Sequence, residues 1–179
     1  MTYLSNVGLP DLVPPPPSEL AAPKAAAEPA PCAAVTRQAL QDLSDTITAA
    51  REKAEANVAV NGEGAPGAVY PVAATLGRDH LIKAHDNTTV LLAWVDKWGV
   101  PPGLIGYPAI SYGIYGYCRD VLPQLHHARH WETVNAVYNA SRGTAAVTVE
   151  CINLITAAVE LAEPLATNAT GCYLAAYGL

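Results

Sequence analysis

Apolar residues recur at spacings of three and four over residues 34–58, and this pattern sets the fold class more firmly than any other. The residues concerned are Val35, Ala39, Leu43, Ile47, Ala50, Ala54 and Val58. Because an α-helix turns once every 3.6 residues, they share one face. Charged residues fill the other faces, and Asn61-Gly62 interrupts the pattern. The spacing predicts an amphipathic helix over 34–58, followed by a Gly-rich loop over 60–69.

The rest of the chain favours further helices over strands, because no alternating apolar run is long enough to predict a sheet. We expect helices over 72–98, 109–122, 123–142 and 144–162, and a short helix in the tail up to Leu179. Pro123 is expected in a first turn, where a missing N–H is tolerated. Pro164 is expected to end the helix before it. The sequence therefore predicts a mainly α protein, an irregular bundle of about four to five helices.

Residues 1–33 form a separate unit that is rich in proline. The prolines are Pro10, Pro14 to Pro17, Pro23, Pro29 and Pro31. Proline fixes φ and lacks an N–H, so we expect an extended, polyproline-like arm rather than a helix or central strand. An extended segment without a core of its own suits the surfaces of partner proteins. We therefore divide the chain into an arm, 1–33, and a helical domain, 34–179.

The composition leaves little charged surface to face water. The chain is 51% hydrophobic and 15% charged, whereas a soluble domain is about 25% charged. This deficit indicates that partners or a membrane cover part of the surface. The formal net charge of −6 argues against a nucleic-acid binder, which needs a basic stripe. The one basic cluster, Arg119–Arg142, also contains Asp120 and Glu132, and we expect it to be a solvated helix face.

Two segments raise the question of membrane contact. Residues 98–118 carry no formal charge, but three prolines break them, so we expect no span there. The Tyr-rich segment 107–117 suits a protein interface or a lipid headgroup layer equally well. Residues 144–162 are apolar on nearly every face, and we expect a buried central helix because Glu150 would be costly in lipid. Membrane spans in these two segments remain the alternative.

The four cysteines, Cys32, Cys118, Cys151 and Cys172, show no zinc-type spacing. We expect small buried side chains and leave their disulfide state open. The N-terminal residues lack the pattern of a secretory signal or of a transit peptide.

His126 and His130 are the weak candidates for a metal site. They are four residues apart and therefore share a helix face, as metal-binding pairs do. A third ligand would have to come from elsewhere, for example His80, His85 or Glu150. Histidine pairs at this spacing are common on polar helices, so we predict no metal.

Glu150 is a candidate for proton handling or ligand binding, because it lies in the most apolar segment. The structural alternative is an ion pair with Arg119, Arg129 or Arg142, or a position on an exposed edge. We favour this alternative, since buried carboxylates are rare unless they are paired.

No phosphate-binding loop, dinucleotide fingerprint or nucleophile elbow is present. We therefore predict no catalytic residue, no cofactor and no enzyme. The expected function is a non-catalytic accessory or structural subunit of a large multiprotein assembly. A mitochondrial inner-membrane energy-converting complex, the respiratory chain or ATP synthase, fits best by analogy. The alternatives are a small helical metal-binding protein or enzyme using His126 and His130, a virion structural protein, and an integral membrane protein.

The expected partners are other protein subunits, contacted by the arm 1–33 and by the segment 107–117, with possible membrane contact and no nucleic acid. The expected location is the mitochondrion, in association with its inner membrane.

Overall fold

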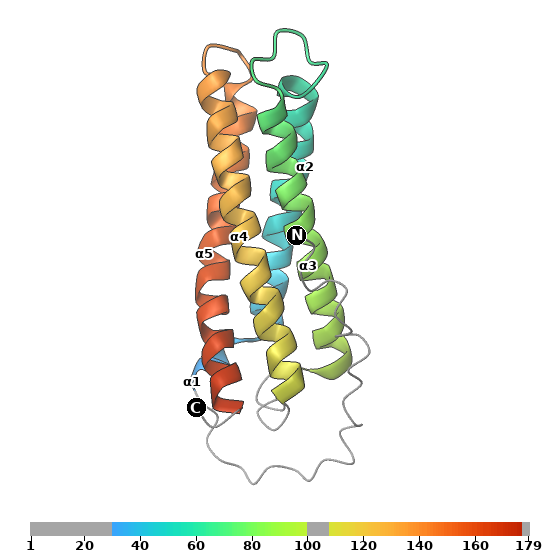
Figure 1. Cartoon of the computed structure of the whole chain (residues 1–179), viewed down its shortest axis with the longest axis vertical. Coiled ribbons are helices and arrows are strands. Elements are labelled where there is room, and N and C mark those ends of the chain that lie inside the picture. The colour runs from blue at the N-terminus through green and yellow to red at the C-terminus, as the bar shows by residue number, and fades with distance from the viewer. Residues whose placement is uncertain (1–29, 100–107, 177–179) are drawn as a thin grey trace.

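A computed structural model describes residues 30–99 and 108–176, and all the regular structure within them is helical (Figure 1). A short helix, α1 (Ala30–Ala34), precedes four long ones. These are α2 (Arg37–Asn61), α3 (Val72–Trp98), α4 (Pro108–Tyr138) and α5 (Ala145–Ala176). The predicted mainly α bundle is confirmed.

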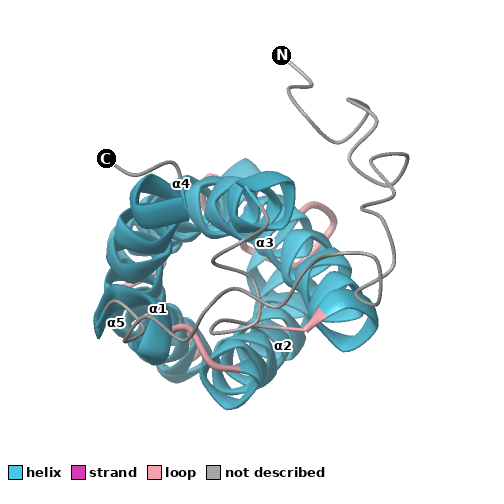
Figure 2. Ribbon diagram, turned by 90° about the horizontal axis from the view of Figure 1, so that it is seen from below, coloured by secondary structure: helices cyan, strands magenta, loops and turns pink. Residues whose placement is uncertain are grey.

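The long helices form an antiparallel four-helix bundle. Each of α2 and α4 packs against both α3 and α5, so the four helices make a ring when viewed along the bundle (Figure 2). The α2–α3 loop, 62–71, and the α4–α5 loop, 139–144, lie side by side at one end, which we call the loop end (Figure 1). The short α1 and the C-terminal part of α5 lie together at the opposite end.

The core is built from aliphatic side chains that all four helices contribute. Its largest fully buried members include Leu40, Leu43, Ile47, Leu81, Leu91, Val121, Leu125 and Ile155. Burying one such side chain contributes about 1.5–3 kcal/mol. The predicted apolar face of 34–58 is confirmed in α2, where Leu43, Ile47, Ala50 and Ala54 are buried.

The first long helix begins and ends slightly later than expected. Thr36 caps α2, since its Oγ1 accepts a hydrogen bond from the Ala39 N–H at 3.1 Å. The helix then runs to Asn61, where the Gly62 N–H bonds to the Val58 carbonyl at 2.8 Å. Ala30–Ala34 form α1, so the expectation of an extended arm up to residue 33 is wrong for its last residues. Pro31 lies in the first turn of α1, the position that tolerates proline.

Two predicted helix boundaries are wrong, because both prolines lie inside continuous helices. Pro123 lies within α4 and Pro164 within α5. Both are exposed, but core residues lie within two positions of each, namely Val121 and Leu125 around Pro123 and Ala162 and Leu165 around Pro164. Proline inside a helix removes one backbone hydrogen bond at a cost of about 3 kcal/mol. Core packing along both flanking segments offsets that cost, and sequence pattern alone does not weigh it.

The predicted central helix, 144–162, is instead one of four equivalent members of the ring, with an exposed face that includes Val149 and Glu160. By length and composition, Ala145–Ala175 could cross a membrane, with a mean hydropathy of 1.6 over its best window. A third of that window is buried inside the bundle, where α5 packs against α1, α2 and α4. A core helix of a soluble bundle passes the same test, so this is weak evidence for a span.

A disulfide joins Cys32 of α1 to Cys172 of α5, with Cα atoms 4.7 Å apart. The two residues are 140 positions apart in sequence, so no local pattern predicts the pair. The expectation of small buried side chains is confirmed for all four cysteines. Their disulfide state, which the sequence left open, is a bond between Cys32 and Cys172 and free thiols at Cys118 and Cys151. Burial raises the pKa of Cys118 to about 12, which makes its thiol unreactive.

Two predicted partner contacts lie outside the described residues. These are the arm up to residue 29 and the side chains of the Tyr-rich segment 107–117, apart from the buried Gly116.

Candidate functional site

Polar side chains are buried together inside the bundle near its loop end. We call this group the polar cluster, and its fully buried members are Asn57, Asn61, Glu132, Asn135, Asn139 and Thr148. They come from α2, α4 and α5 and the start of the α4–α5 loop. Buried polar groups cost free energy unless they are hydrogen-bonded, so a cluster of six inside an aliphatic core is the most unusual feature of this molecule.

Sequence reasoning missed this cluster and misplaced Glu132. The expected solvated face over Arg119–Arg142 is wrong at Glu132, which has no exposed surface. The spacing of these residues along their helices did indicate burial. Asn57 and Asn61 continue the core stripe that Ala50 and Ala54 begin, at spacings of three and four. The charged neighbours of Glu132 masked the same register in α4.

Glu132 is held at the centre of the bundle with one oxygen bonded and the other not. Its Oε2 accepts a hydrogen bond from Asn57 Nδ2 at 2.5 Å. Its Oε1 is buried and has no hydrogen-bond partner among the described residues. Burial raises the pKa of Glu132 to about 7, and the polar groups of Asn135, Asn57 and Cys151 beside it pull the pKa back only in part. This carboxyl therefore titrates near neutral pH.

Gly77 of α3 makes room for that carboxyl. A Cβ atom at position 77 would lie 2.7 Å from Oε1 of Glu132 and 3.0 Å from its carboxyl carbon. Such an approach is closer than real Cβ contacts, so the present position of the Glu132 carboxyl against α3 requires a glycine at residue 77. Asn57, Gly77 and Cys151 thus bring α2, α3 and α5 to the Glu132 side chain of α4.

A chain of hydrogen bonds connects Glu132 to a guanidinium at the loop end. Arg142 Nη1 donates to Asn61 Oδ1 at 2.7 Å, and Asn61 Nδ2 donates to Asn57 Oδ1 at 2.7 Å. Asn57 Nδ2 then donates to Glu132 Oε2. Every donor points from the cation toward the carboxyl, so the two amide dipoles are aligned with each other. Thr148 Oγ1 also donates to Asn57 Oδ1, at 3.0 Å.

The same cluster fixes the α2–α3 loop. Arg142 Nη2 donates to the Pro66 carbonyl at 2.7 Å. The Asn139 side chain pairs with the backbone of Val69, since its Oδ1 accepts from the Val69 N–H at 3.2 Å and its Nδ2 donates to the Val69 carbonyl at 3.1 Å. Tyr70 follows with a φ of 57°, which is rare for a side chain of its size. The loop is therefore anchored by Arg142 and Asn139 in addition to the backbone hydrogen bonds of its own turns.

Four large apolar or aromatic side chains are exposed beside this loop, and we call them the loop-end surface. They are Val69, Tyr70, Val137 and Tyr138, with exposed fractions of 48%, 43%, 70% and 53%. The Tyr70 and Tyr138 rings pack with their centroids 5.1 Å apart. The surface is thus formed jointly by the α2–α3 loop and the end of α4.

The predicted metal candidates do not assemble into a ligand set. His126 lies near Glu163, with Nε2 3.8 Å from Oε1, and its Nδ1 is 3.3 Å from Arg129. His130 packs edge-on against Trp131 instead. Within residues 30–99 and 108–176, no three potential ligands from His, Cys, Asp and Glu gather at one point.

The proposed third ligands are also engaged elsewhere. His80 Nδ1 lies 2.8 Å from Gln124 Oε1, and His85 lies 3.3 Å from Asp86. Glu150 pairs with Lys53 at 2.6 Å, and 58% of its side chain is exposed. The exposed edge that we favoured for Glu150 is confirmed, but its partner is Lys53 rather than one of the three arginines.

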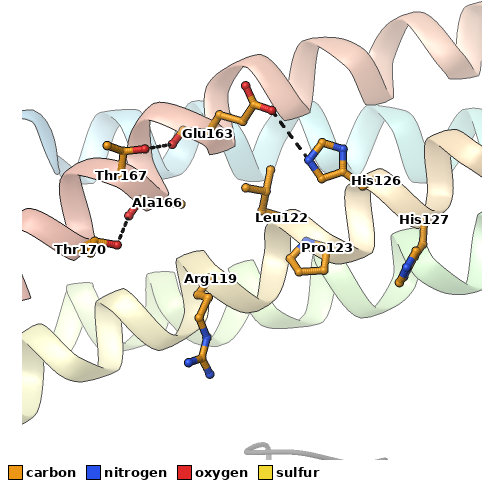
Figure 3. A pocket seen from close by; sticks show the side chains of 9 residues that line it. All are labelled: Arg119, Leu122, Pro123, His126, His127, Glu163, Ala166, Thr167 and Thr170. Atoms are coloured by element: carbon orange, nitrogen blue, oxygen red, sulfur yellow. Dashed lines mark hydrogen bonds and ion pairs between the residues drawn. The ribbon is translucent and has the colours of Figure 1, made fainter.

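A shallow groove of about 730 Å³ runs between α4 and α5 (Figure 3). Its lining residues include Leu122, Pro123 and His126 from α4 and Glu163 and Thr167 from α5. His126 and Glu163 face each other across it, whereas the Arg119 side chain points away from α5 (Figure 3). Pro123 lines the groove, and Pro164 follows its lining residue Glu163, so a proline lies at or beside the groove in each helix.

No known protein family, no curated protein and no solved structure matches this chain.

Proposed function

We propose that this protein is a non-catalytic structural subunit of a larger protein assembly and that it docks through the loop-end surface. The observation that carries the proposal is the grouping of Val69, Tyr70, Val137 and Tyr138 at one end of the bundle. Grouped exposed apolar side chains mark interaction sites on soluble proteins, whereas scattered ones need no explanation. Tyrosine is also enriched at protein interfaces.

The rigidity of this surface supports the same proposal. Asn139 holds the backbone of Val69, and Arg142 holds the carbonyl of Pro66. Binding to a surface that is already ordered costs less conformational entropy than binding to a flexible loop. The buried polar cluster therefore stabilises the geometry with which the loop-end surface meets a partner.

The finer assignments stay predictions. A mitochondrial inner-membrane energy-converting complex remains our preferred assembly, with a virion as the alternative. The Cys32–Cys172 disulfide supports a location in an oxidising compartment, where such bonds persist. In a membrane assembly this domain would then lie on the oxidising side. The proposed contacts through the arm 1–33 and the segment 107–117 add to the docking surface.

The test is the mass of the particle in which the native protein travels, measured after extraction in mild detergent. We expect a particle far heavier than the 18.7 kDa of the chain. Migration at the chain's own mass would refute the proposal.

A matched pair of variants then tests the surface. Val137→Asp places a charge on the loop-end surface. Val90→Asp places a charge on an exposed valine of α3, about 27 Å along that helix from Val72, the residue that follows the α2–α3 loop. We expect Val137→Asp to release the chain from the particle and Val90→Asp to leave it bound. Equal behaviour of the two variants would place the docking surface elsewhere.

A further inference from the structure

We propose that Glu132 is a proton-operated lock on the loop end of the bundle: the neutral carboxyl keeps α3 and α4 closed at Gly77, and its ionisation admits water there and loosens the loop-end surface. The link to docking rests on the proposed function, but the lock itself does not.

The closed state leaves no place for a charge on Oε1. That oxygen is buried, has no hydrogen-bond donor among the described residues, and fills the space beside Gly77 where a side chain would otherwise be. A neutral carboxyl tolerates such a position far better than a carboxylate, which needs donors on both oxygens. The Asn135 amide and the Cys151 thiol lie near the carboxyl, but neither bonds to Oε1. Further donors therefore have to come from water, which reaches Oε1 if α3 moves away from α4.

Among the residues that the structure describes, the groups around Glu132 do not supply a compensating cation. From α2 it meets the amide of Asn57, from α3 the backbone of Gly77, and from α5 the thiol of Cys151. The Cys151 pKa is itself raised by burial, so this thiol stays neutral and adds no charge. On α4 the neighbouring Asn135 is an uncharged amide as well.

The nearest cations along each element are engaged with other partners. Lys53 of α2 pairs with Glu150, and Arg78 of α3 pairs with Asp79. On α4, Arg129 contacts His126. Past the end of α4, Arg142 reaches the carboxyl only through the two intervening asparagines. The ionised state is therefore solvated by opening rather than neutralised in place.

Separation of α3 from α4 at Gly77 would affect the loop end, because hydrogen bonds connect Glu132 to the α2–α3 loop. Asn57 bonds to Glu132 and to Asn61, and Asn61 bonds to Arg142, which holds the Pro66 carbonyl. When the carboxylate turns toward water, Asn57 either follows it or gives up this bond, and in both cases the arrangement of Asn57, Asn61 and Arg142 shifts. The α2–α3 loop loses part of its anchor as a consequence.

The test is hydrogen exchange of the hydrogen-bonded backbone amides of 76–78 in α3 and of Ala68 and Val69 in the loop, corrected for the intrinsic effect of pH. With the pKa of Glu132 raised from 4.5 to about 7, the opening equilibrium rises roughly thirtyfold between pH 5.5 and 8.5 if the open carboxyl is fully solvated. We expect the protection factors of the amides in both segments to fall by roughly thirtyfold over this pH range. In Glu132→Gln the dependence should disappear, whereas Glu160→Gln, which alters an exposed carboxylate on α5, should behave as wild type.

Direct titration of the Glu132 carboxyl by carbon-13 NMR in the unmodified protein keeps the proposal testable if Glu132→Gln does not fold. A midpoint near 7 supports the lock, and a midpoint near 4.5 overturns it. Exchange that is independent of pH, or equally dependent on pH in Glu132→Gln, also overturns it. None of these measurements uses a partner, so a failed lock and a failed docking surface give different results.

Discussion

At the scale of single residues, Glu132 makes the stability of the fold depend on pH in an unusual direction. Most carboxylates in proteins are stabilised by partners and lose that stabilisation in acid. Here burial raises the folded-state pKa from 4.5 to about 7. Between these values the folded chain holds a proton that the unfolded chain has released. The contribution to stability is therefore complete below about pH 4.5 and is lost as the pH rises through 7.

We predict that the free energy of unfolding, relative to that of Glu132→Gln, falls by about 2 kcal/mol between pH 5.5 and 8.5. Urea unfolding of both proteins at several pH values measures these free energies. Subtracting one from the other removes the contributions of the other titrating groups. At pH 8.5 the variant should be the more stable protein. A difference that stays constant with pH would show that Glu132 titrates normally.

Gly77 provides the second prediction at this scale. Alanine usually stabilises a helix relative to glycine by about 1 kcal/mol. At position 77 the added Cβ would meet the Glu132 carboxyl, and overpacking of this kind costs about 1–3 kcal/mol. Gly77→Ala should therefore destabilise the bundle in thermal or urea unfolding.

Gly116→Ala is the matched control for this substitution. Gly116 is a buried glycine of α4, and no atom outside its own stretch of helix lies within 4 Å of the place that a Cβ would take. Alanine there should be neutral or stabilising. If both substitutions shift stability equally, Gly77 makes no special space for Glu132.

The same residues show what sequence reasoning reaches and what it does not. The apolar spacing of α2 identified its core face, because Leu43, Ile47, Ala50 and Ala54 on that stripe are all apolar. Asn57 and Glu132 occupy the same kind of stripe, but their chemistry indicates solvent. Their burial depends on partners from other helices, and no pattern within one helix reveals those partners.

At the scale of elements, the two prolines separate local preference from tertiary packing. Local rules place helix boundaries at Pro123 and Pro164, yet α4 and α5 continue through both. These rules correctly account for the backbone hydrogen bond that each proline removes. They do not include the core contacts that each helix makes on both sides of its proline.

We predict that Pro123→Ala and Pro164→Ala each stabilise the bundle, by about 1–3 kcal/mol, because each restores a backbone hydrogen bond at an exposed position. The greater freedom of alanine in the unfolded chain reduces the gain by up to about 1 kcal/mol. Urea unfolding of the single variants checks this. A loss of stability in either variant would mean that the packing of α4 against α5 requires the interruption.

At the scale of the whole molecule, the disulfide fixes α1, and with it the start of the described chain, to the end of the bundle that lies opposite the loop end. Its two cysteines are 140 positions apart. Cross-links over loops of this size stabilise mainly by restricting the unfolded chain, commonly by about 2–5 kcal/mol. The approximate number and placement of the long helices were accessible from sequence, but this link between distant parts of the chain was not.

We predict that reduction with dithiothreitol lowers the free energy of unfolding by about 2–5 kcal/mol while the bundle stays helical. Circular dichroism during urea unfolding, with and without the reductant, measures both properties. The double variant Cys32→Ser, Cys172→Ser should match the reduced protein and be insensitive to dithiothreitol. A reductant effect that persists in this variant would have to come from another part of the chain.

The most direct test of the account is site-specific photo-crosslinking in the native host, with a benzophenone amino acid placed at Tyr138 and, as the control, at Val90. Both positions are exposed, but only Tyr138 belongs to the loop-end surface. The account predicts one discrete heavier adduct from position 138 and none from position 90. Adducts at both positions alike, or at position 90 alone, would contradict docking through the loop end.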